Sequence, residues 1–487
     1  MPVSAVVNPG DIVRFLPELI LTVAATLLMI LDPVVNRRSS ALFGNLSLLA
    51  LIAALFGSVA AYAQAGPAFG GLLSVDGFAT FFRVLVIVVG ILTVLPSYRF
   101  LARQDAETGE YHALLLFSIA GQCLMVSANE LIMIFIGLEI SSIASYVLAG
   151  YLRDDKRANE AAIKYFLLGS FATGFFLYGV ALVYGATGTV NLSMARAAIT
   201  GANAPSPVFI GIAAALMFVG LGFKVSASPF QMWAPDVYQG APTPVTAFLS
   251  AGPKAAAFAV FLRIFMTAFE PIGNGWEPLV WVCALLSMCI GNFAALLQHN
   301  VKRLLAYSSI AHAGYVLVAL AARSDVGTAA AMFYLAAYAL MNIGAFAVVS
   351  HLSGKGERYQ TLDDFAGLGQ KQPVTAAMLS IFLLSLIGVP LTGGFFGKFY
   401  IFKAALQSHL VWLTVLGLLN SAVAAYYYLR ILVMMYMHEP SEAATGAEPL
   451  TPGLAAALVL PAIGTLFLGI FPSWVLNFAG KSSNLLK

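Results

Sequence analysis

Long runs of apolar residues, each near the length that crosses a lipid bilayer, recur along the whole chain. A membrane-spanning helix needs about 20 mostly apolar residues, and reading for such runs predicts about fourteen spans. Their approximate cores are residues 15–31, 41–62, 78–97, 112–128, 130–152, 160–185, 207–223, 244–269, 276–297, 303–322, 328–351, 375–406 (broken), 411–437 and 453–472. The pattern therefore predicts an all-α polytopic membrane protein.

The composition agrees with this fold class and leaves little material for a soluble domain. Of the 487 residues, 60% are hydrophobic and only 10% are charged. A typical soluble domain contains about 25% charged residues. The formal net charge of +3 is too small to indicate a nucleic-acid partner.

The positions of lysine and arginine predict how the chain is oriented. Basic residues gather in alternate loops: Arg37 and Arg38 after the first span, Arg99 and Arg103 after the third, Arg153, Lys156 and Arg157 after the fifth, Lys302 and Arg303 after the ninth, and Lys355, Arg358 and Lys371 after the eleventh. The positive-inside rule places these loops in the cytoplasm and both chain ends on the periplasmic side. The first apolar segment lacks a basic n-region and an Ala-x-Ala site, so we interpret it as a retained span.

Two of the predicted spans are interrupted by helix breakers next to a lysine. Residues 222–230 combine Lys224 with a Ser- and Pro-containing break, and residues 388–398 combine a Gly- and Pro-rich break with Lys398. A bilayer tolerates broken helices only where protein or water satisfies the freed backbone groups. An intramembrane lysine is costly and usually faces a partner or a wet cavity. Two such elements indicate movement of an ion or substrate through the membrane.

The placement of the breaks also predicts an internal repeat. Spans four to eight can be laid over spans nine to thirteen, and the odd offset inverts the second unit relative to the first. The break falls in the fourth span of each unit, and a titratable residue, Glu139 or His312, falls in the second. We therefore divide the chain into a three-helix segment (1–111), two inverted repeats (112–270 and 271–438) and a C-terminal helix (439–487).

Three lysines and a glutamate lie at intramembrane depth and are candidate functional groups. Glu139 lies roughly 13 Å into its span at about 1.5 Å per residue. Lys224 and Lys398 flank the breaks, and Lys254 follows Pro253 in a stretch of small residues. The structural alternatives are a hydrogen-bonded neutral glutamic acid, a lysine that snorkels to the interface, and a fixed ion pair.

The remaining intramembrane groups carry weaker signals. His312 can relay protons near neutral pH, although a hydrogen-bonded core histidine is a common alternative. Lys164 is close to the end of its span, where snorkelling explains it equally well. Arg83, Arg263 and Arg430 cannot usefully deprotonate, so we interpret them as ion-pair partners or interface anchors. Together the lysines, the histidine and Glu139 predict a switchable proton wire.

No motif for a bound cofactor or metal is found in the sequence. Cys123, Cys283 and Cys289 lie within predicted spans and form no CxxC pair. Neither iron–sulfur ligation nor a disulfide framework is therefore supported. No glycine-rich nucleotide fingerprint is present.

Four long stretches of the sequence resemble the antiporter-like membrane subunits of complex I, the bacterial NADH–quinone oxidoreductase. These stretches are residues 222–238, 240–245, 302–312 and 393–398. Within that family the chain looks most like the subunit N type, because it ends soon after span fourteen and has Lys398 where subunit M is expected to carry Glu. The resemblance implies fourteen helices, inverted five-helix repeats and breaks in helices seven and twelve.

The resemblance also implies a function and roles for individual residues. It implies proton translocation driven by NADH oxidation and quinone reduction in other subunits, which would hold NADH, FMN, iron–sulfur clusters and quinone. It assigns Glu139 and Lys224 to a first half-channel as a pair, Lys254 and His312 to a central axis, and Lys398 to a second half-channel, with a weaker role for Lys164. The expected partners are other membrane subunits of the complex, including neighbouring antiporter-like subunits, and lipid in the bacterial inner membrane.

Other functions remain open from the sequence. A subunit of an Mrp-type cation/proton antiporter or of a membrane-bound hydrogenase would share the broken helices. The absence of a rich oxygen-ligand cluster for Na⁺ counts mildly against an antiporter. A structural membrane spacer would make the buried charges dispensable, and a solute transporter would need a large cavity.

Overall fold

The computed structural model is one bundle of long apolar helices that lie side by side. It describes residues 8–34, 40–446 and 448–483. The principal helices are α2 (Leu16–Leu31), α3 (Ser40–Ala63), α4 (Gly77–Arg103), α5 (Gly109–Ser127), α6 (Leu131–Ala149), α7 (Lys156–Thr187), α9 (Pro207–Val225), α11 (Thr243–Thr267), α12 (Gly273–Leu296), α13 (Val301–Ala321), α14 (Asp325–Leu352), α16 (Pro373–Ile387), α17 (Gly393–Gln407), α18 (Val411–Met437) and α20 (Pro452–Ile470). The predicted all-α membrane fold is confirmed. Arg37 and Arg38 lie outside the described residues.

Every predicted apolar range coincides with one of these helices or with a broken pair of them. Twelve helices in the described ranges are long and apolar enough to cross a membrane. Leu16–Leu31 and Pro373–Ile387 are shorter apolar helices. The total of fourteen spans therefore depends on counting α2 and the pair α16 and α17, and it stays a prediction.

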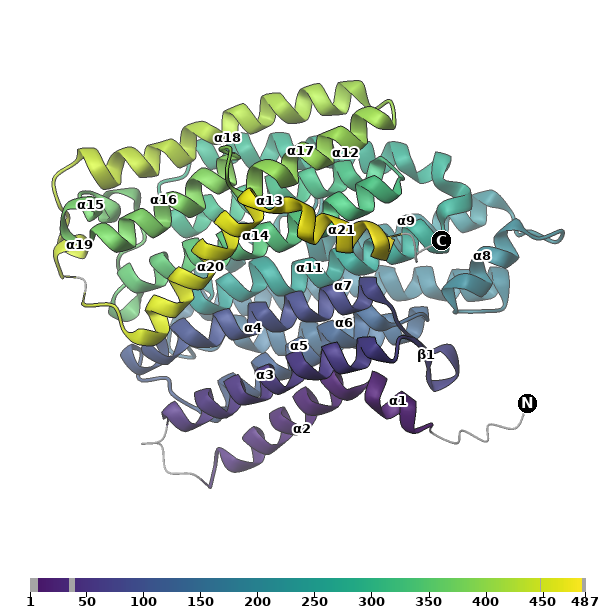
Figure 1. Cartoon of the computed structure of the whole chain (residues 1–487), viewed down its shortest axis with the longest axis horizontal. Coiled ribbons are helices and arrows are strands. Elements are labelled where there is room, and N and C mark those ends of the chain that lie inside the picture. Colours follow the sequence, from purple (N-terminus) through teal and green to yellow (C-terminus); the bar gives the residue numbers. More distant parts are fainter. Residues whose placement is uncertain (1–7, 35–39, 447, 484–487) are drawn as a thin grey trace.

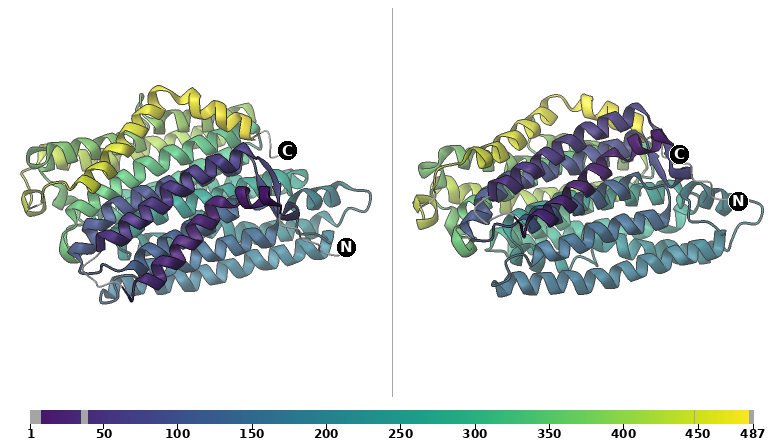
Figure 2. Two further views of the ribbon diagram at one scale, coloured as in Figure 1. Left: turned by 60° about the horizontal axis from the view of Figure 1, so that its bottom comes forward. Right: turned by 90° about the horizontal axis from the view of Figure 1, so that it is seen from below.

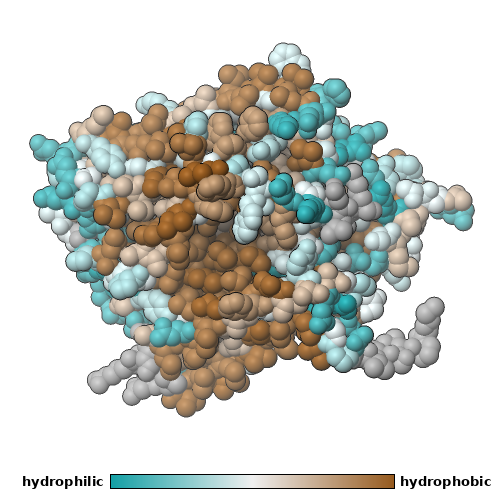
Figure 3. All heavy atoms as spheres, viewed as in Figure 1, coloured by the Kyte–Doolittle hydropathy of each residue, from teal (hydrophilic) through white to brown (hydrophobic). Residues whose placement is uncertain are grey.

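The helices lie side by side, with α11 and α14 in the middle, α2 and α3 along one edge and α18 along the opposite edge (Figure 1). The views from other sides show the same alignment (Figure 2). Side chains of α11, α13 and α14 are almost entirely buried inside the chain. An apolar band crosses the visible face, with hydrophilic residues at both ends of the helices (Figure 3). This is the surface expected of a bundle that stands in a bilayer.

Both predicted breaks are present. The first separates α9 from the short helix α10 (Trp233–Gly240), and Ser226 ends α9 in a left-handed conformation. The second separates α16 from α17, with positive φ at Gly388 and Leu391. Lys224 lies in the last turn before the first break, and Lys398 lies in the helix that follows the second.

Several short elements were not predicted from the sequence. They are helices α1 (Pro9–Arg14), α8 (Leu192–Thr200), α15 (Leu368–Lys371), α19 (Glu442–Gly446) and α21 (Pro472–Ser483), the 3₁₀ turns Phe69–Gly71, Glu270–Ile272, Lys355–Glu357 and Leu362–Phe365, and an antiparallel hairpin of β1 (Gly66–Ala68) and β2 (Leu73–Val75). Where one helix was expected in 439–487, the segment contains α19, α20 and α21. Pro472 separates α21 from α20, because proline favours the first turn of a new helix.

Loops that carry the predicted cytoplasmic charges meet at one end of the bundle. Lys355 pairs with Asp105, and Arg157 donates to the Gly356 carbonyl. At the other end, α1 and α21 lie near the hairpin, as the ends of the coloured chain show (Figure 1). The first and last described helices therefore share one side of the membrane. Which side that is stays a prediction.

The intramembrane arginines are ion-pair partners in two of three cases. The Arg83 guanidinium contacts the Glu18 carboxylate at 2.6 Å, and both side chains are buried. Arg263 pairs with Asp76 at 3.0 Å. The ion-pair interpretation is thus confirmed for Arg83 and Arg263. Arg430 instead contacts the Leu296 carbonyl and the ring of His299.

The substitution Arg83→Met is expected to destabilise the fold by about 3–5 kcal/mol, because it leaves the Glu18 carboxylate buried without its partner. Adding Glu18→Gln should restore much of the loss, since the uncompensated charge is then removed. The measurement is the temperature at which the purified complex loses this chain. Arg153→Met is the control, because that arginine is 81% exposed. Equal temperatures for Arg83→Met and the control would contradict the prediction.

Candidate functional site

Lys224 is held at the first break by hydroxyl groups of the neighbouring helix. Its Nζ donates to Ser142 Oγ at 2.6 Å and to the Tyr146 hydroxyl at 3.0 Å, both on α6. It also lies 5.0 Å from the centre of the Tyr146 ring, within reach of a cation–π interaction. The lysine is therefore anchored to α6, one turn beyond Glu139.

Glu139 does not form the expected direct pair with Lys224. In the described part of the chain no ion pair joins them, and one Glu139 carboxylate oxygen is buried without a hydrogen-bond partner. The cause is local, because Ser142 lies three residues after Glu139 on the same face of α6 and takes up the lysine. A proton that passes between Glu139 and Lys224 must therefore pass Ser142 or a water beside it.

Lys254 reaches from α11 to α13, where it meets the turn that carries His312. Its Nζ donates to the Ser309 carbonyl oxygen at 3.2 Å and also contacts the Ser309 hydroxyl. Residues three apart share one face of a helix, so Ser309 and His312 are neighbours along α13. The structure thus brings Lys254 close to His312 without a direct bond between them.

His312 is hydrogen-bonded at both ring nitrogens by tyrosines from two other helices. Nδ1 lies 2.5 Å from the Tyr334 hydroxyl of α14, and Nε2 lies 3.1 Å from the Tyr428 hydroxyl of α18. Tyr428 also contacts the Ser308 hydroxyl. A neutral imidazole donates from one nitrogen and accepts at the other, while hydroxyls can do either. This arrangement can therefore exchange the donor and acceptor roles of its members.

Lys398 caps the broken end of α16. Its Nζ donates to the carbonyl oxygens of Leu386 and Ile387 at 3.0 and 2.9 Å and to Ser421 Oγ at 2.8 Å. Such carbonyls at a helix C-terminus lack intrahelical partners and carry partial negative charge. The ammonium also lies 4.9 Å from the centre of the Tyr315 ring.

Aromatic contacts link Lys398 back to the centre of the bundle. The Tyr315 ring packs edge-on against the His312 ring at 5.5 Å between centroids. On its other side, Lys398 lines an apolar cavity of about 630 Å³ between α17 and α18, together with Thr414 and Gln407. Lys398 therefore lies between the central histidine and a cavity that opens at the surface of the described chain.

Lys164 lies apart from the buried row. Its side chain is 39% exposed and pairs with Glu160 at 2.6 Å and Asp236 at 2.7 Å. Asp236 also pairs with Arg303. The structure does not bring Lys164 together with the other candidate residues, and its contacts are those of a partly exposed ion-pair network.

Sequence reasoning missed several polar residues of the site. Most contacts to the buried lysines and to His312 come from serine and tyrosine hydroxyls, those of Ser142, Tyr146, Ser309, Tyr334 and Tyr428. Serine and tyrosine occur often in apolar spans, so composition alone does not single them out. The usable signal is a hydroxyl three residues from a buried titratable group, as in the pairs 139/142 and 309/312.

Lys302, one of the basic residues that follow span nine, lies in the first turn of α13. It is fully buried, pairs with Glu357 at 2.9 Å and donates to the Ala241 carbonyl oxygen at 2.7 Å. Glu357 in turn accepts from the backbone amide and hydroxyl of Thr243. The physical reason is that the turn before α11 and the loop after α14 close over the N-terminus of α13.

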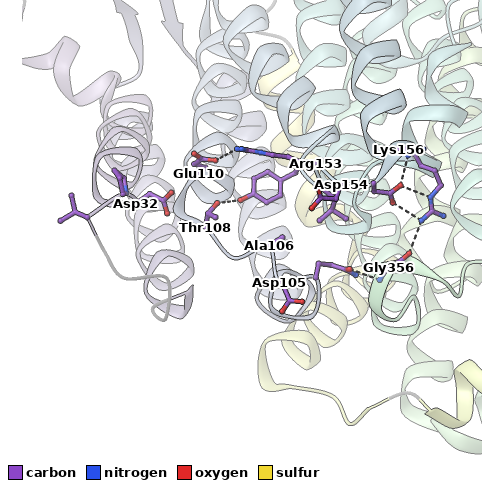
Figure 4. A pocket seen from close by; sticks show the side chains of 16 residues that line it. Asp32, Asp105, Ala106, Thr108, Glu110, Arg153, Asp154, Lys156 and Gly356 are labelled. Carbon is purple, nitrogen blue, oxygen red and sulfur yellow. Dashed lines mark hydrogen bonds and ion pairs between the residues drawn. The ribbon is translucent and has the colours of Figure 1, made fainter.

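A wide hollow on the described surface is remote from the intramembrane charges. It measures about 1620 Å³ and is lined by charged loop residues near Asp105, Glu110 and Gly356 (Figure 4). Within it, Asp155 is the N-cap residue of α7 and accepts hydrogen bonds from Arg157. Partial burial raises the pKa of the Asp155 carboxyl, but hydrogen bonds from Arg157 outweigh this and hold it below the ordinary value. The hollow is therefore lined by hydrogen-bonded polar groups of the loops at the end of the bundle.

The sequence matches known membrane proteins over its whole length. A family profile described as "NADH:quinone oxidoreductase/Mrp antiporter, TM" matches residues 128–424. The chain is 77% identical to "NADH-quinone oxidoreductase subunit N 1" of Solibacter usitatus, with all of both chains covered. The chain belongs to the subunit N family of NADH-quinone oxidoreductases. The predicted resemblance is thereby confirmed.

Solved structures of related complexes share the fold of the chain. A chain of the respiratory complex I of Thermus thermophilus is 37% identical, with a TM-score of 0.81 and coverage of 95% of this chain and 99% of that one. A chain of the Mrp complex of Dietzia sp. is 22% identical with a TM-score of 0.84, covering 97% of each. The fold is thus shared with an Mrp protein, while the sequence identity points to the subunit N family.

In this subunit, the substitution Tyr428→Phe is expected to lower turnover of the assembled complex by about fivefold. Loss of a hydrogen bond that contributes about 1 kcal/mol in the transition state corresponds to that change in rate. The substitution removes the contacts of the hydroxyl to His312 and Ser308 and leaves the ring in place. The measurement is NADH-driven quinone reduction with proton movement. Tyr111→Phe, another buried tyrosine hydrogen-bonded to a serine, is the control. Equal rates for both variants would contradict the prediction.

Proposed function

We propose that the chain moves protons across the membrane as a subunit of NADH–quinone oxidoreductase. The observation that carries this proposal is the row of buried bases, Lys224, Lys254, His312 and Lys398, that links the two helix breaks. Each base contacts at least one serine or tyrosine hydroxyl. Hydroxyls both donate and accept hydrogen bonds, so they can pass a proton between bases.

The proposed route follows the contacts of this row. A proton enters past Glu139, reaches Lys224 through the Ser142 hydroxyl, and passes to Lys254. Ser309 leads from Lys254 to His312 along α13. Beyond His312 the route continues to Lys398, which lines the surface cavity between α17 and α18.

We further propose that the driving reaction takes place in other subunits. In this view the chain has no redox site of its own, and NADH, FMN, iron–sulfur clusters and quinone are bound elsewhere in the complex. Its partners are other membrane subunits, including neighbouring antiporter-like ones. The same proposal places the chain in the bacterial inner membrane with both termini in the periplasm.

A second candidate is exchange of a cation for a proton, as in an Mrp-type antiporter or a related membrane-bound hydrogenase. The shared fold with the Dietzia Mrp chain supports this alternative. Co-purification separates the two candidates. Association with flavin- and iron–sulfur-bearing subunits favours the complex I function, whereas association with antiporter subunits alone favours the alternative.

The substitution Lys224→Ala is expected to lower quinone reduction and coupled proton movement by at least about tenfold, a conservative figure for loss of a proton-transfer group. Assembly should stay near normal, because Ser142 and Tyr146 can still bind water. The measurements are NADH-driven quinone reduction and acidification by membranes that contain the assembled complex. Lys355→Ala is the matched control, since that lysine is 69% exposed. Normal rates of both activities in Lys224→Ala would remove this lysine from the mechanism.

Lys254 and His312 are expected to act on one route, so their defects should be non-additive. Lys254→Arg keeps the charge but cannot release a proton, and it should therefore be strongly impaired. His312→Ala should be milder, because water can fill the gap between the two tyrosines. The measurement is a double-mutant cycle on coupled turnover, normalised to assembled complex. Fully additive losses, or wild-type activity in Lys254→Arg, would leave Lys254 as a fixed structural charge.

A further inference from the structure

In the described part of the chain, three aromatic rings surround the ammonium group of Lys224. Its Nζ lies 5.0, 5.7 and 5.9 Å from the ring centres of Tyr146, Tyr165 and Phe223. These rings come from α6, α7 and α9, which meet at the first break. A cation within about 6 Å of a ring centre is attracted by the negative face of the ring. We call Tyr146, Tyr165 and Phe223 the aromatic cage.

Tyr165 is the member of the cage whose ring is fixed by other rings. It is buried, and it stacks on Trp233 with 4.4 Å between ring centroids and 8° between the planes. The Tyr146 ring meets it edge-on, with a centroid distance of 4.7 Å and planes 89° apart. Stacked and edge-on contacts are both favourable arrangements of aromatic pairs. Together they leave the Tyr165 ring little freedom to turn away from Lys224.

Trp233 connects the cage to the broken backbone. It begins α10, the short helix beyond the break, and its indole N–H donates to the Phe223 carbonyl oxygen at 2.9 Å. The Trp233 ring also packs on the Phe223 ring at 5.2 Å between centroids. Phe223 directly precedes Lys224 in the chain. The side chain that backs the Tyr165 ring is therefore also bonded to the end of α9 that carries the lysine.

The cage provides an interaction that the hydroxyl contacts of Lys224 do not. An ammonium group has three N–H donors, and the hydroxyls of Ser142 and Tyr146 accept from it at 2.6 and 3.0 Å. A hydroxyl can bind a neutral amine as well as an ammonium group, because it both donates and accepts. A ring face attracts the cation through the ring quadrupole. The cage therefore favours the charged lysine at the break without an acidic group in contact with it.

We propose that Tyr165, backed by Trp233, is a positioning residue that holds the ammonium group of Lys224 at the first break. This inference rests on the proposed function, in which Lys224 carries protons. The cage keeps the charged side chain beside Ser142 between transfers, and neither Tyr165 nor Trp233 gains or loses a proton. A cation–π contact is weaker than a buried ion pair, so the cage holds the lysine and still allows it to release its proton.

The deciding test replaces Tyr165, in the assembled complex, by phenylalanine and by phenylalanine analogues that carry one, two and three ring fluorines. Fluorine withdraws electron density from the ring face and changes the ring size little, so the cation–π attraction falls stepwise while the packing is kept. The measurement is NADH-driven quinone reduction with proton movement. Tyr165→Phe should stay near wild type, because it keeps the ring. Turnover should then fall with each fluorine, by about fivefold in all.

The same fluorine series at Phe218 is the matched control. This buried ring of α9 packs against Phe261 and Phe265 and makes no cation–π contact in the described part of the chain. Its series should therefore be flat. An equal decline at Phe218 and at Tyr165 would show that fluorine acts through packing, and it would overturn the cage.

Two leucine variants test the support that Trp233 gives to Tyr165. Tyr165→Leu removes the ring, and Trp233→Leu removes the ring that backs it. Each should lower turnover about fivefold per assembled complex, and the double variant should be no worse than either alone, because both act on one contact. Fully additive losses would overturn the role of Trp233. Should a leucine variant fail to assemble, the fluorine series still decides, since it preserves the packing.

Lys224→Ala is measured in parallel to separate this inference from the proposed function. A strong defect in Lys224→Ala, together with a flat fluorine series at Tyr165, would overturn the cage and leave the proposed function standing. Normal activity in Lys224→Ala would overturn both. A strong defect in Lys224→Ala, with a decline at Tyr165 and none at Phe218, is the result expected from the cage.

Discussion

Backbone that is broken inside a membrane must find hydrogen-bonding partners within the protein, and this constraint organises the molecule. At the second break Lys398 donates to the freed carbonyls of Leu386 and Ile387. At the first break the Trp233 indole donates to the Phe223 carbonyl, and Ser287 Oγ accepts from the Ser228 amide. Because water is scarce at this depth, each break draws polar side chains into an apolar bundle.

The same requirement explains why hydroxyl groups surround the buried bases. A lysine that satisfied its charge with a carboxylate would be held in one protonation state, whereas a neutral hydroxyl partner leaves the proton free to move. Lys224, Lys254 and Lys398 each contact a serine hydroxyl. By contrast, the fixed ion pair of Arg83 with Glu18 lies among the N-terminal helices, away from the row. The hydroxyl-bound lysines are thus kept apart from this buried arginine–glutamate pair.

The two halves of the molecule are also tied together at the end that carries the basic loops. Lys302 at the start of α13 holds the Ala241 carbonyl, which ends the short helix after the first break. Its partner Glu357 follows α14 and binds Thr243 at the start of α11. Separating a buried ion pair leaves an uncompensated charge and strongly destabilises a protein. The segments that hold Lys302 and Glu357 are therefore constrained to move together.

The sequence alone determined the membrane fold, the two breaks and the identity of the buried bases, because hydropathy, helix breakers and charge are properties of short segments. It left Arg83 and Arg263 as either ion-pair partners or interface anchors. Only the tertiary structure decided which groups meet. Lys224 binds Ser142 in place of Glu139, and His312 lies between tyrosines 22 and 116 residues away. Such contacts depend on how each helix is rotated against its neighbours, and rotation is set by packing across the whole bundle rather than by local sequence.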